Sequence, residues 1–161
     1  MIKPATTQDF EFFYSLYFHP LVNPYLLYEM MDKSAFQPIY EDLLAQKILF
    51  IFEKDEQDVG MFKLIPLTYR SSHIAYLGGV AIHPDYSGKG YGSQMVQALV
   101  DYGETLGLKR IELSVAAINE KATHIYEKAG FQKEGVLRNY TYLKSENKYI
   151  DEILMSYLYP L

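Results

Sequence analysis

The sequence lacks cysteine, an excess of basic residues and long hydrophobic segments, and each absence excludes a class of protein. Without cysteine the chain forms no disulfide, no thiolate metal site and no acyl-cysteine intermediate. Its 15 basic residues (Lys and Arg) are outnumbered by 20 acidic ones, which gives a formal net charge of −5. Binding to a nucleic-acid backbone requires clustered cationic side chains, so we expect no nucleic-acid partner. The longest apolar run, 48–52, is too short to span a bilayer, so no membrane partner is expected.

The remaining composition is that of an ordinary globular protein. The first residues lack the apolar run of a signal peptide, so a cytoplasmic location is expected. No repeat, low-complexity tract or linker divides the 161 residues, of which 49% are hydrophobic, so we predict a single domain over 1–161. The histidines show no spacing typical of a metal site, and no metal is expected; they are His19, His73, His83 and His124.

Hydrophobic residues at helical spacing predict four helices. A capping box is expected at the start of the first helix, where Asp9 follows Thr6. A second capping box is expected for the second helix, where Gln37 follows Ser34. The third helix is predicted to begin at Tyr91. Residues 18–33 would connect the first two helices.

Glycine, asparagine and alternating apolar residues define the other elements. Gly103 and Gly107 are expected to weaken the third helix near its end. Asn119 is the expected N-cap of the fourth helix, which Gly130 closes. The order βααβββαβαββ predicts an α/β fold, with a mixed, mostly antiparallel sheet flanked by helices. After a short first strand, the strands are expected in 47–53, 59–67, 73–82, 109–115, 131–143 and 149–159.

Three glycines at alternate positions, Gly88, Gly90 and Gly92, stand at the start of the third helix. A glycine-rich turn there aims several backbone N–H groups in the same direction as the positive end of the helix dipole, which makes an anion site. Glycine adopts positive φ and leaves room for a phosphate oxygen to reach the main chain, while Lys89 adds a charge from the side. A sharp turn without any ligand would show the same pattern.

Three phosphate-binding designs compete for this loop. A Walker loop requires Ser or Thr after its lysine, where Gly90 stands. A dinucleotide fingerprint requires its third glycine three positions after the second, whereas Gly92 stands two positions after Gly90. A dinucleotide-dependent enzyme therefore stays only as an alternative. The third design is the pyrophosphate loop of acyl-CoA enzymes.

The segments VAIHPDYSGKGYG and NEKATHIYEKAGF, together with the element order, resemble the GNAT superfamily of acyl-CoA-dependent N-acyltransferases. EGVLRN and YIDEILMSY resemble its branch of protein N-terminal and polyamine acetyltransferases. The resemblance implies acetyl-CoA as cosubstrate, with its pantetheine arm along the main chain of Val80, Ala81 and Ile82 at a bulge marked by Gly78 and Gly79. Ser87 replaces the usual Gln or Arg of the family's loop motif. The implied cofactor-binding residues of that motif and beyond are Ser87, Gly88, Lys89, Gly90, Tyr91, Gly92 and Asn119.

The resemblance also implies direct transfer of the acetyl group to a primary amine in a ternary complex. Tyr126 lies seven residues after Asn119, the family's spacing for the tyrosine that protonates the departing thiolate. The same helical position is also compatible with plain core packing. Relatives often carry a glutamate base where Leu77 and Ser114 stand here. The base is therefore open among a water chain, Tyr76, His73 and Glu29.

In this superfamily the acceptor pocket is framed by the connection 18–33 and by 138–148, and both segments are rich in tyrosine. Tyrosine suits a flat or apolar amine and stacks on cations, so a small-molecule amine or a peptide N-terminus is expected. Dimers are common among members, which leaves a homodimer open. A CoA-binding or sensory module without turnover is the alternative function. The candidate substrate-binding residues are Tyr25, Tyr28, Glu29, Tyr76 and Tyr140.

Overall fold

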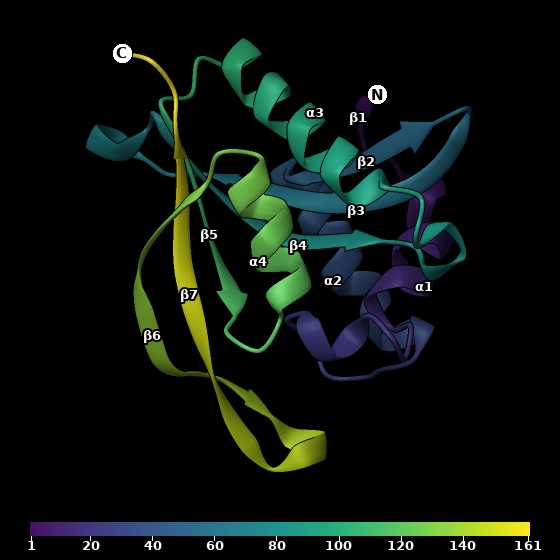
Figure 1. Cartoon of the computed structure of the whole chain (residues 1–161). Coiled ribbons are helices and arrows are strands. Elements are labelled where there is room, and N and C mark those ends of the chain that lie inside the picture. Colours follow the sequence, from purple (N-terminus) through teal and green to yellow (C-terminus); the bar gives the residue numbers. More distant parts are fainter. The chain divides into compact units, whose positions relative to one another are not determined.

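The computed structural model describes all 161 residues, which form two compact units. The first unit comprises 1–64 and 79–92, and the second comprises 65–78 and 93–161. Helices and strands follow one another in the predicted order, interrupted only by short 3-10 turns (Figure 1). The four helices are α1 (Phe10–Tyr17), α2 (Lys33–Gln46), α3 (Tyr91–Thr105) and α4 (Glu120–Lys128).

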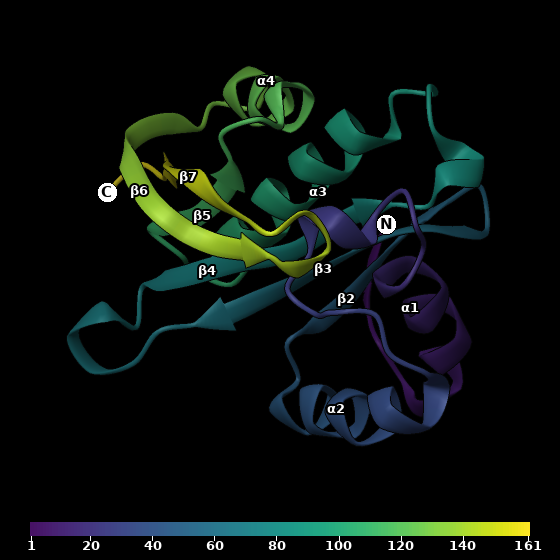
Figure 2. The same ribbon diagram turned by 90° about the horizontal axis from the view of Figure 1, so that it is seen from below.

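The first unit is built on an antiparallel sheet of β1 (Ile2–Pro4), β2 (Leu49–Lys54) and β3 (Gln57–Pro66). The predicted hairpin between β2 and β3 is confirmed. Its two turn residues, Asp55 and Glu56, have φ of 51° and 62°, as a tight hairpin turn that follows the strand twist requires. Figure 2 shows α1 and α2 on one face of β2 and β3.

Capping side chains explain where the two helices of this unit begin. The capping box predicted from Thr6 and Asp9 is present, and it starts a 3-10 turn that leads directly into α1. The cap predicted at Ser34 is wrong, because Asp32 Oδ1 accepts from the backbone N–H of Ala35 at 2.8 Å. Ser34 already lies inside α2 and donates to Asp32 instead. An aspartate two residues earlier therefore takes the N-cap position.

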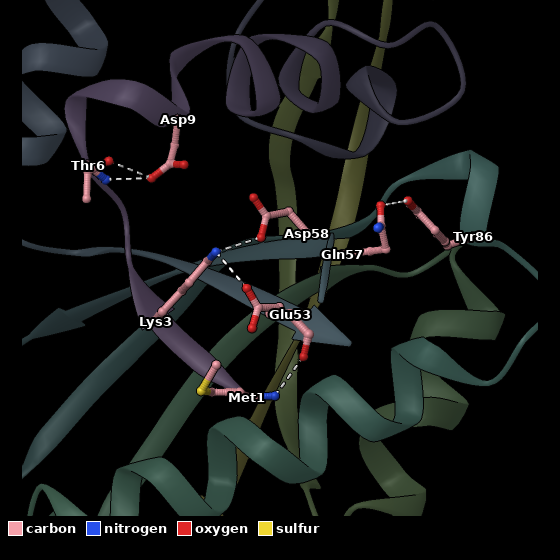
Figure 3. Close-up of polar contacts among 8 residues, drawn as sticks. All are labelled: Met1, Lys3, Thr6, Asp9, Glu53, Gln57, Asp58 and Tyr86. Carbon is pink, nitrogen blue, oxygen red and sulfur yellow. Dashed lines mark hydrogen bonds and ion pairs between the residues drawn. The ribbon is translucent and has the colours of Figure 1, made fainter. Parts of the chain in front are cut away.

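Aromatic side chains form the core of the first unit. Phe13, Phe36 and Tyr40 are almost fully buried, and the rings of Phe13 and Tyr40 lie 5.6 Å apart. At the sheet edge, Lys3 Nζ lies 2.9 Å from carboxylate oxygens of both Glu53 and Asp58 (Figure 3). These two ion pairs fasten β1 to the β2–β3 hairpin.

The second unit holds the start of the fourth strand and the whole of the last three strands. The first three residues of β4 (Ile74–Ile82) pair in parallel with β5 (Arg110–Ala116). β5 pairs antiparallel with β7 (Lys148–Leu158), which in turn pairs antiparallel with β6 (Gln132–Leu143). Figure 1 shows β6 and β7 as a long ribbon, with α4 beside β5. The protein therefore has the predicted α/β fold with a mostly antiparallel seven-strand sheet.

Helix α3 continues through Gly103 and ends at Thr105, so only the second of the two glycines marks its end. Gly107 has a φ of 75° just beyond the helix, as a left-handed C-terminal residue does. Gly103 has a packing role instead, because an added Cβ there would overlap Tyr159 Oη and lie 3.0 Å from Ile111 Cδ1. No helix is long and apolar enough to cross a membrane.

Candidate active site

The glycine-rich loop follows β4 through the 3-10 turn Pro84–Tyr86. Gly88 and Gly90 have φ of 75° and 76°, in the region that only glycine adopts readily. An added Cβ on either residue would meet no heavy atom within 4 Å. Residues 87–90 are exposed, and Tyr91 is the first residue of α3. The main chain of this loop is thus open to a ligand.

Side chains of the first unit hold the turn that precedes the loop. Tyr86 Oη donates to Gln57 Oε1 at 3.3 Å, which ties the turn to the β2–β3 hairpin (Figure 3). His83 Nδ1 accepts from the backbone N–H of Asp85 at 3.2 Å and caps the turn. Lys89 Nζ lies 5.7 Å from the centroid of the Tyr86 ring, within reach of a cation–π interaction. The cation of Lys89 is therefore kept beside the loop.

The stretch of β4 before the loop has an irregular backbone. Gly79 has a φ of 58°, which interrupts the pleat where the sequence predicts a bulge. Of the three residues predicted to pair with the pantetheine arm, Ala81 is buried, whereas Val80 and Ile82 are half-buried. These main-chain positions and the loop are continuous in sequence and lie in one unit.

Asn119 caps α4, as predicted. Its Oδ1 accepts from the backbone N–H of Ala122 at 3.2 Å, and its carbonyl accepts from Thr123 Oγ1 at 3.0 Å. The carboxamide nitrogen donates to no atom of the protein, so it is free to contact a ligand. Its role toward the cofactor stays a prediction.

Tyr126 lies on α4, at a position compatible with both of the roles considered for it. Its ring packs at 5.6 Å against the ring of Phe131, and the residue is only 7% exposed. Burial, with a smaller contribution from the charge that Tyr76 would carry, raises the pKa of the Tyr126 phenol. The only fully buried side-chain polar atom without a partner is Tyr17 Oη. Tyr126 Oη makes no hydrogen bond and is therefore still reachable from the surface.

The two positions where relatives often carry glutamate are occupied differently. Leu77 is buried in the core. Ser114 Oγ lies 3.0 Å from the hydroxyl of Tyr76, and either atom can donate. The other two candidate bases, His73 and Glu29, are exposed, and His73 stands before the first residue of β4. Among these candidates, only Tyr76 has a charged form that raises the pKa of Tyr126.

The predicted substrate residues are placed in different units. Tyr25, Tyr28 and Glu29 belong to the connection between α1 and α2, and the ring of Tyr28 packs 5.3 Å from that of Tyr17. Tyr76 and Tyr140 belong to the second unit. Tyr140 lines an open depression on β6 and β7, together with Val136, Leu137, Arg138, Asn139 and Asp151. No three His, Asp or Glu side chains are grouped as metal ligands would be.

Comparison with known proteins decides the family. Residues 10–131 match the profile of the acetyltransferase (GNAT) family. The chain belongs to this family. A spermidine N(1)-acetyltransferase of Vibrio cholerae is 30% identical over 117 residues, which are 71% of this chain and 64% of that protein. A spermidine N(1)-acetyltransferase of Escherichia coli is 33% identical over 98 residues, which are 60% of this chain and 52% of that protein. The match thus spans less than two thirds of these curated relatives.

The fold agrees with that of solved GNAT structures. The crystal structure of spermidine N-acetyltransferase from Vibrio cholerae in complex with CoA and spermine superimposes with a TM-score of 0.85. That alignment covers 98% of this chain and 94% of that one, at 24% identity. The chain therefore has the GNAT fold over nearly all of its length.

One buried charged residue of this GNAT protein escaped the sequence reasoning. Lys63 stands in the apolar strand β3 and is only 6% exposed. Its Nζ lies 5.2 Å from the centroid of the Tyr28 ring. A single lysine within the apolar run GMFKLIP was the signal that could have found it.

Proposed function

We propose that this protein is an acetyl-CoA-dependent N-acetyltransferase that transfers an acetyl group directly to a primary amine. The observation that carries the proposal is the open loop at 87–92. Gly88 and Gly90 take left-handed conformations there, and no atom stands in the space in front of them. Exposed backbone N–H groups at the start of a helix suit a diphosphate, so the residues present fit coenzyme A.

The residues that would hold acetyl-CoA are those of the GNAT pattern. The main chain of 87–92, with the Lys89 cation, would bind the diphosphate, and the main chain of Val80, Ala81 and Ile82 would bind the pantetheine arm. Asn119 would donate its free carboxamide N–H. When bound, acetyl-CoA supplies an acetyl group activated as a thioester.

Three hydroxyl groups of the second unit handle protons in this proposal. Tyr126 holds a proton at Oη, and its raised pKa keeps the phenol neutral even at alkaline pH. It donates that proton to the departing thiolate and takes up another from water. The incoming amine must lose a proton. Tyr76 Oη and Ser114 Oγ form a hydrogen-bonded pair that can accept at one end and donate at the other. The pair relays the proton of the amine to water.

The acceptor would be a small amine or a peptide N-terminus. Support comes from the relatives, which are named for spermidine and, in Salmonella typhimurium, for the alanine of ribosomal protein bS18. Tyr25, Tyr28, Glu29 and Tyr140 are the residues proposed to contact it. A homodimer is part of the same proposal, and light scattering of the purified protein would test it.

Two measurements test the function. Calorimetric titration with acetyl-CoA should give binding heat. In the second measurement, acetyl-CoA is incubated with polyamines, amino acids, aminoglycosides or peptides, and thiol release should appear with one of these classes of amine. Absence of both binding heat and a change of melting temperature at millimolar acetyl-CoA would overturn the proposal. Binding without thiol release for any amine would instead indicate a CoA-binding module. Protection by NAD alone would indicate a dinucleotide enzyme.

A further inference from the structure

Four residues of the first unit meet at the irregular point of β4. Tyr17 comes from α1, Tyr28 from the connection that follows it, Lys63 from β3 and Gly79 from β4. Lys63 Nζ lies 5.2 Å from the centroid of the Tyr28 ring and 6.0 Å from that of Tyr17. An added Cβ on Gly79 would lie 2.6 Å from Tyr17 Oη and 3.4 Å from Lys63 Cε. Because Gly79 has no side chain, the hydroxyl of Tyr17 and the side chain of Lys63 can lie against the backbone of β4 at this point.

Two polar groups of this cluster, Lys63 Nζ and Tyr17 Oη, have no hydrogen-bond or ion-pair partner in the protein. None of the ion pairs includes Lys63, which is 6% exposed. Tyr17 is fully buried, and its Oη has no hydrogen-bond partner. Burial without a counter-ion lowers the pKa of the Lys63 ammonium. Asp42, whose charge affects the Tyr28 phenol, hydrogen-bonds to Gln46 and makes no ion pair with Lys63. An unpaired cation on a largely buried side chain, next to a buried hydroxyl without a partner, indicates a missing anionic ligand.

The connection after α1 is fixed in a way that keeps this cluster beside the proposed acceptor residues. Asn23 Nδ2 donates to the carbonyl oxygens of both Tyr17 and Tyr28 at 2.8 Å. The rings of Tyr17 and Tyr28 cross edge to face at 5.3 Å. Because Tyr28 is half-exposed and Lys63 Nζ lies 5.2 Å from the centroid of its ring, the cation lies next to the proposed acceptor segment.

We propose that Lys63 Nζ and Tyr17 Oη bind a carboxylate of the acceptor, so that the amine substrate is one that carries a carboxylate, such as a free amino acid. This inference rests on the proposed function. A carboxylate accepts from both donors and supplies the missing counter-ion. A polyamine carries only cationic groups and would bring a like charge toward Lys63. The acceptor class therefore differs from the spermidine for which the Vibrio cholerae and Escherichia coli relatives are named.

The test compares acceptors that differ only in the carboxylate. Thiol release is measured for alanine, alaninamide and spermidine at saturating acetyl-CoA, with each rate expressed per concentration of neutral amine. Hydrogen bonds to a charged group are worth about 10- to 100-fold, so the wild-type kcat/KM should be higher for alanine by that factor. Lys63→Met should abolish this preference. Lys33→Met is the matched control, because Lys33 Nζ also lies over a tyrosine ring, 5.7 Å from Tyr14, but is exposed and paired with Glu11.

A binding experiment keeps the inference independent of turnover. N-acetylalanine should bind wild-type protein, and Lys63→Met should weaken that binding about 10-fold or more. Thiol release that is as fast with alaninamide as with alanine would overturn the inference and leave the proposed function standing. If no amine releases thiol, the proposed function fails, and equal binding of N-acetylalanine to both proteins would then overturn the carboxylate site as well. If the methionine variant does not fold, Lys63→Gln replaces it, and the comparison of acceptors on wild-type protein still decides.

Discussion

The hydroxyl of Tyr76 lies 3.0 Å from Oγ of Ser114, across the only parallel strand pair of the second unit. The two residues are 38 positions apart in sequence, and Ser114 stands where GNAT relatives often carry a glutamate. Two hydroxyl groups in contact can relay a proton but cannot hold it as a carboxylate does. In the proposed mechanism the pair therefore provides a path for the proton to water in place of a fixed base.

A double-mutant cycle would test whether this pair acts as one unit. Tyr76→Phe and Ser114→Ala should each lower kcat/KM by about 2- to 10-fold, the effect of one neutral hydrogen bond. The double variant should lose no more than either single variant, because each substitution already breaks the relay. Tyr69→Phe, which alters a tyrosine that is 93% exposed, should leave the rate unchanged. Additive losses would show that the two hydroxyl groups act independently.

Replacement of Tyr126 by phenylalanine tests the proposed proton donor. Tyr126→Phe removes only the hydroxyl and keeps the packing of the ring against Phe131. Loss of a general acid typically lowers kcat by about 10²- to 10⁴-fold, and the dissociation constant of acetyl-CoA should change little. Steady-state kinetics and calorimetry measure the two quantities.

Tyr157→Phe serves as the control for that experiment. Tyr157 packs on the other contact of Phe131, with ring centroids 5.7 Å apart. This variant should retain kcat within about twofold, because Tyr157 transfers no proton in the proposed mechanism. If the two variants behaved alike, Tyr126 would be a core residue only.

Substitution of the loop glycines tests acetyl-CoA binding, and another glycine of the same chain serves as the control. Gly88→Ala and Gly90→Ala should weaken acetyl-CoA binding about 10-fold or more, since a Cβ disfavours φ near 75° and stands before the backbone donors. Gly107 has the same φ of 75° and the same open surroundings, but it follows α3. Gly107→Ala should lower the free energy of unfolding by about 1–2 kcal/mol, as the loop variants do, without affecting acetyl-CoA affinity. Equal affinity losses in all three variants would contradict the loop assignment.

The order of the elements was predictable from the sequence, because it depends on local chemistry. Pairing between distant strands was not predictable. Helical spacing, the Thr6 cap and the tight turn at Asp55 and Glu56 all depend on residues close in sequence. The position of β7 between β5 and β6 does not, because it depends on which edges remain free after folding. The N-cap of α2 was misplaced because Asp32 and Ser34 are both good capping residues, and their competition is settled by the path of the preceding connection.

The candidate site divides in the same way. Left-handed conformations at Gly88 and Gly90 follow from the residue type, so the loop could be predicted. The burial of Lys63 between two tyrosines follows from long-range packing of α1, β3 and β4, and no local pattern encodes it. The contacts of Lys63 with Tyr17 and Tyr28, on which the proposed carboxylate site depends, are therefore visible only in the folded chain.

Gly103 gives a stability prediction that opposes helix propensity. Alanine is favoured over glycine in a helix by about 1 kcal/mol, yet a Cβ at Gly103 would overlap Tyr159 Oη. Gly103→Ala should therefore lower the free energy of unfolding by about 1–3 kcal/mol, the usual effect of overpacking. Tyr159→Phe removes the overlapping hydroxyl, so the double variant should be more stable than the sum of the two single losses predicts. Urea unfolding of the four proteins measures this coupling, and simple additivity would contradict the packing role.

Buried phenols make the stability of this protein sensitive to alkaline pH. Burial is the main cause that raises the pKa of Tyr17, Tyr40, Tyr126 and Tyr159, each of which is at most 7% exposed. Above about pH 10 the unfolded chain releases these protons while the folded chain retains them, so the folded state binds more protons and its stability falls as pH rises. Four groups together predict a loss of up to about 5 kcal/mol per pH unit, and little change between about pH 8 and 9.5.

Tyr159→Phe should reduce that slope by about 1.4 kcal/mol per pH unit. Exposed tyrosines such as Tyr69 titrate alike in both states, so Tyr69→Phe should leave the slope unchanged, and a free energy of unfolding that stayed constant to pH 11 would show that the buried phenols ionise without unfolding.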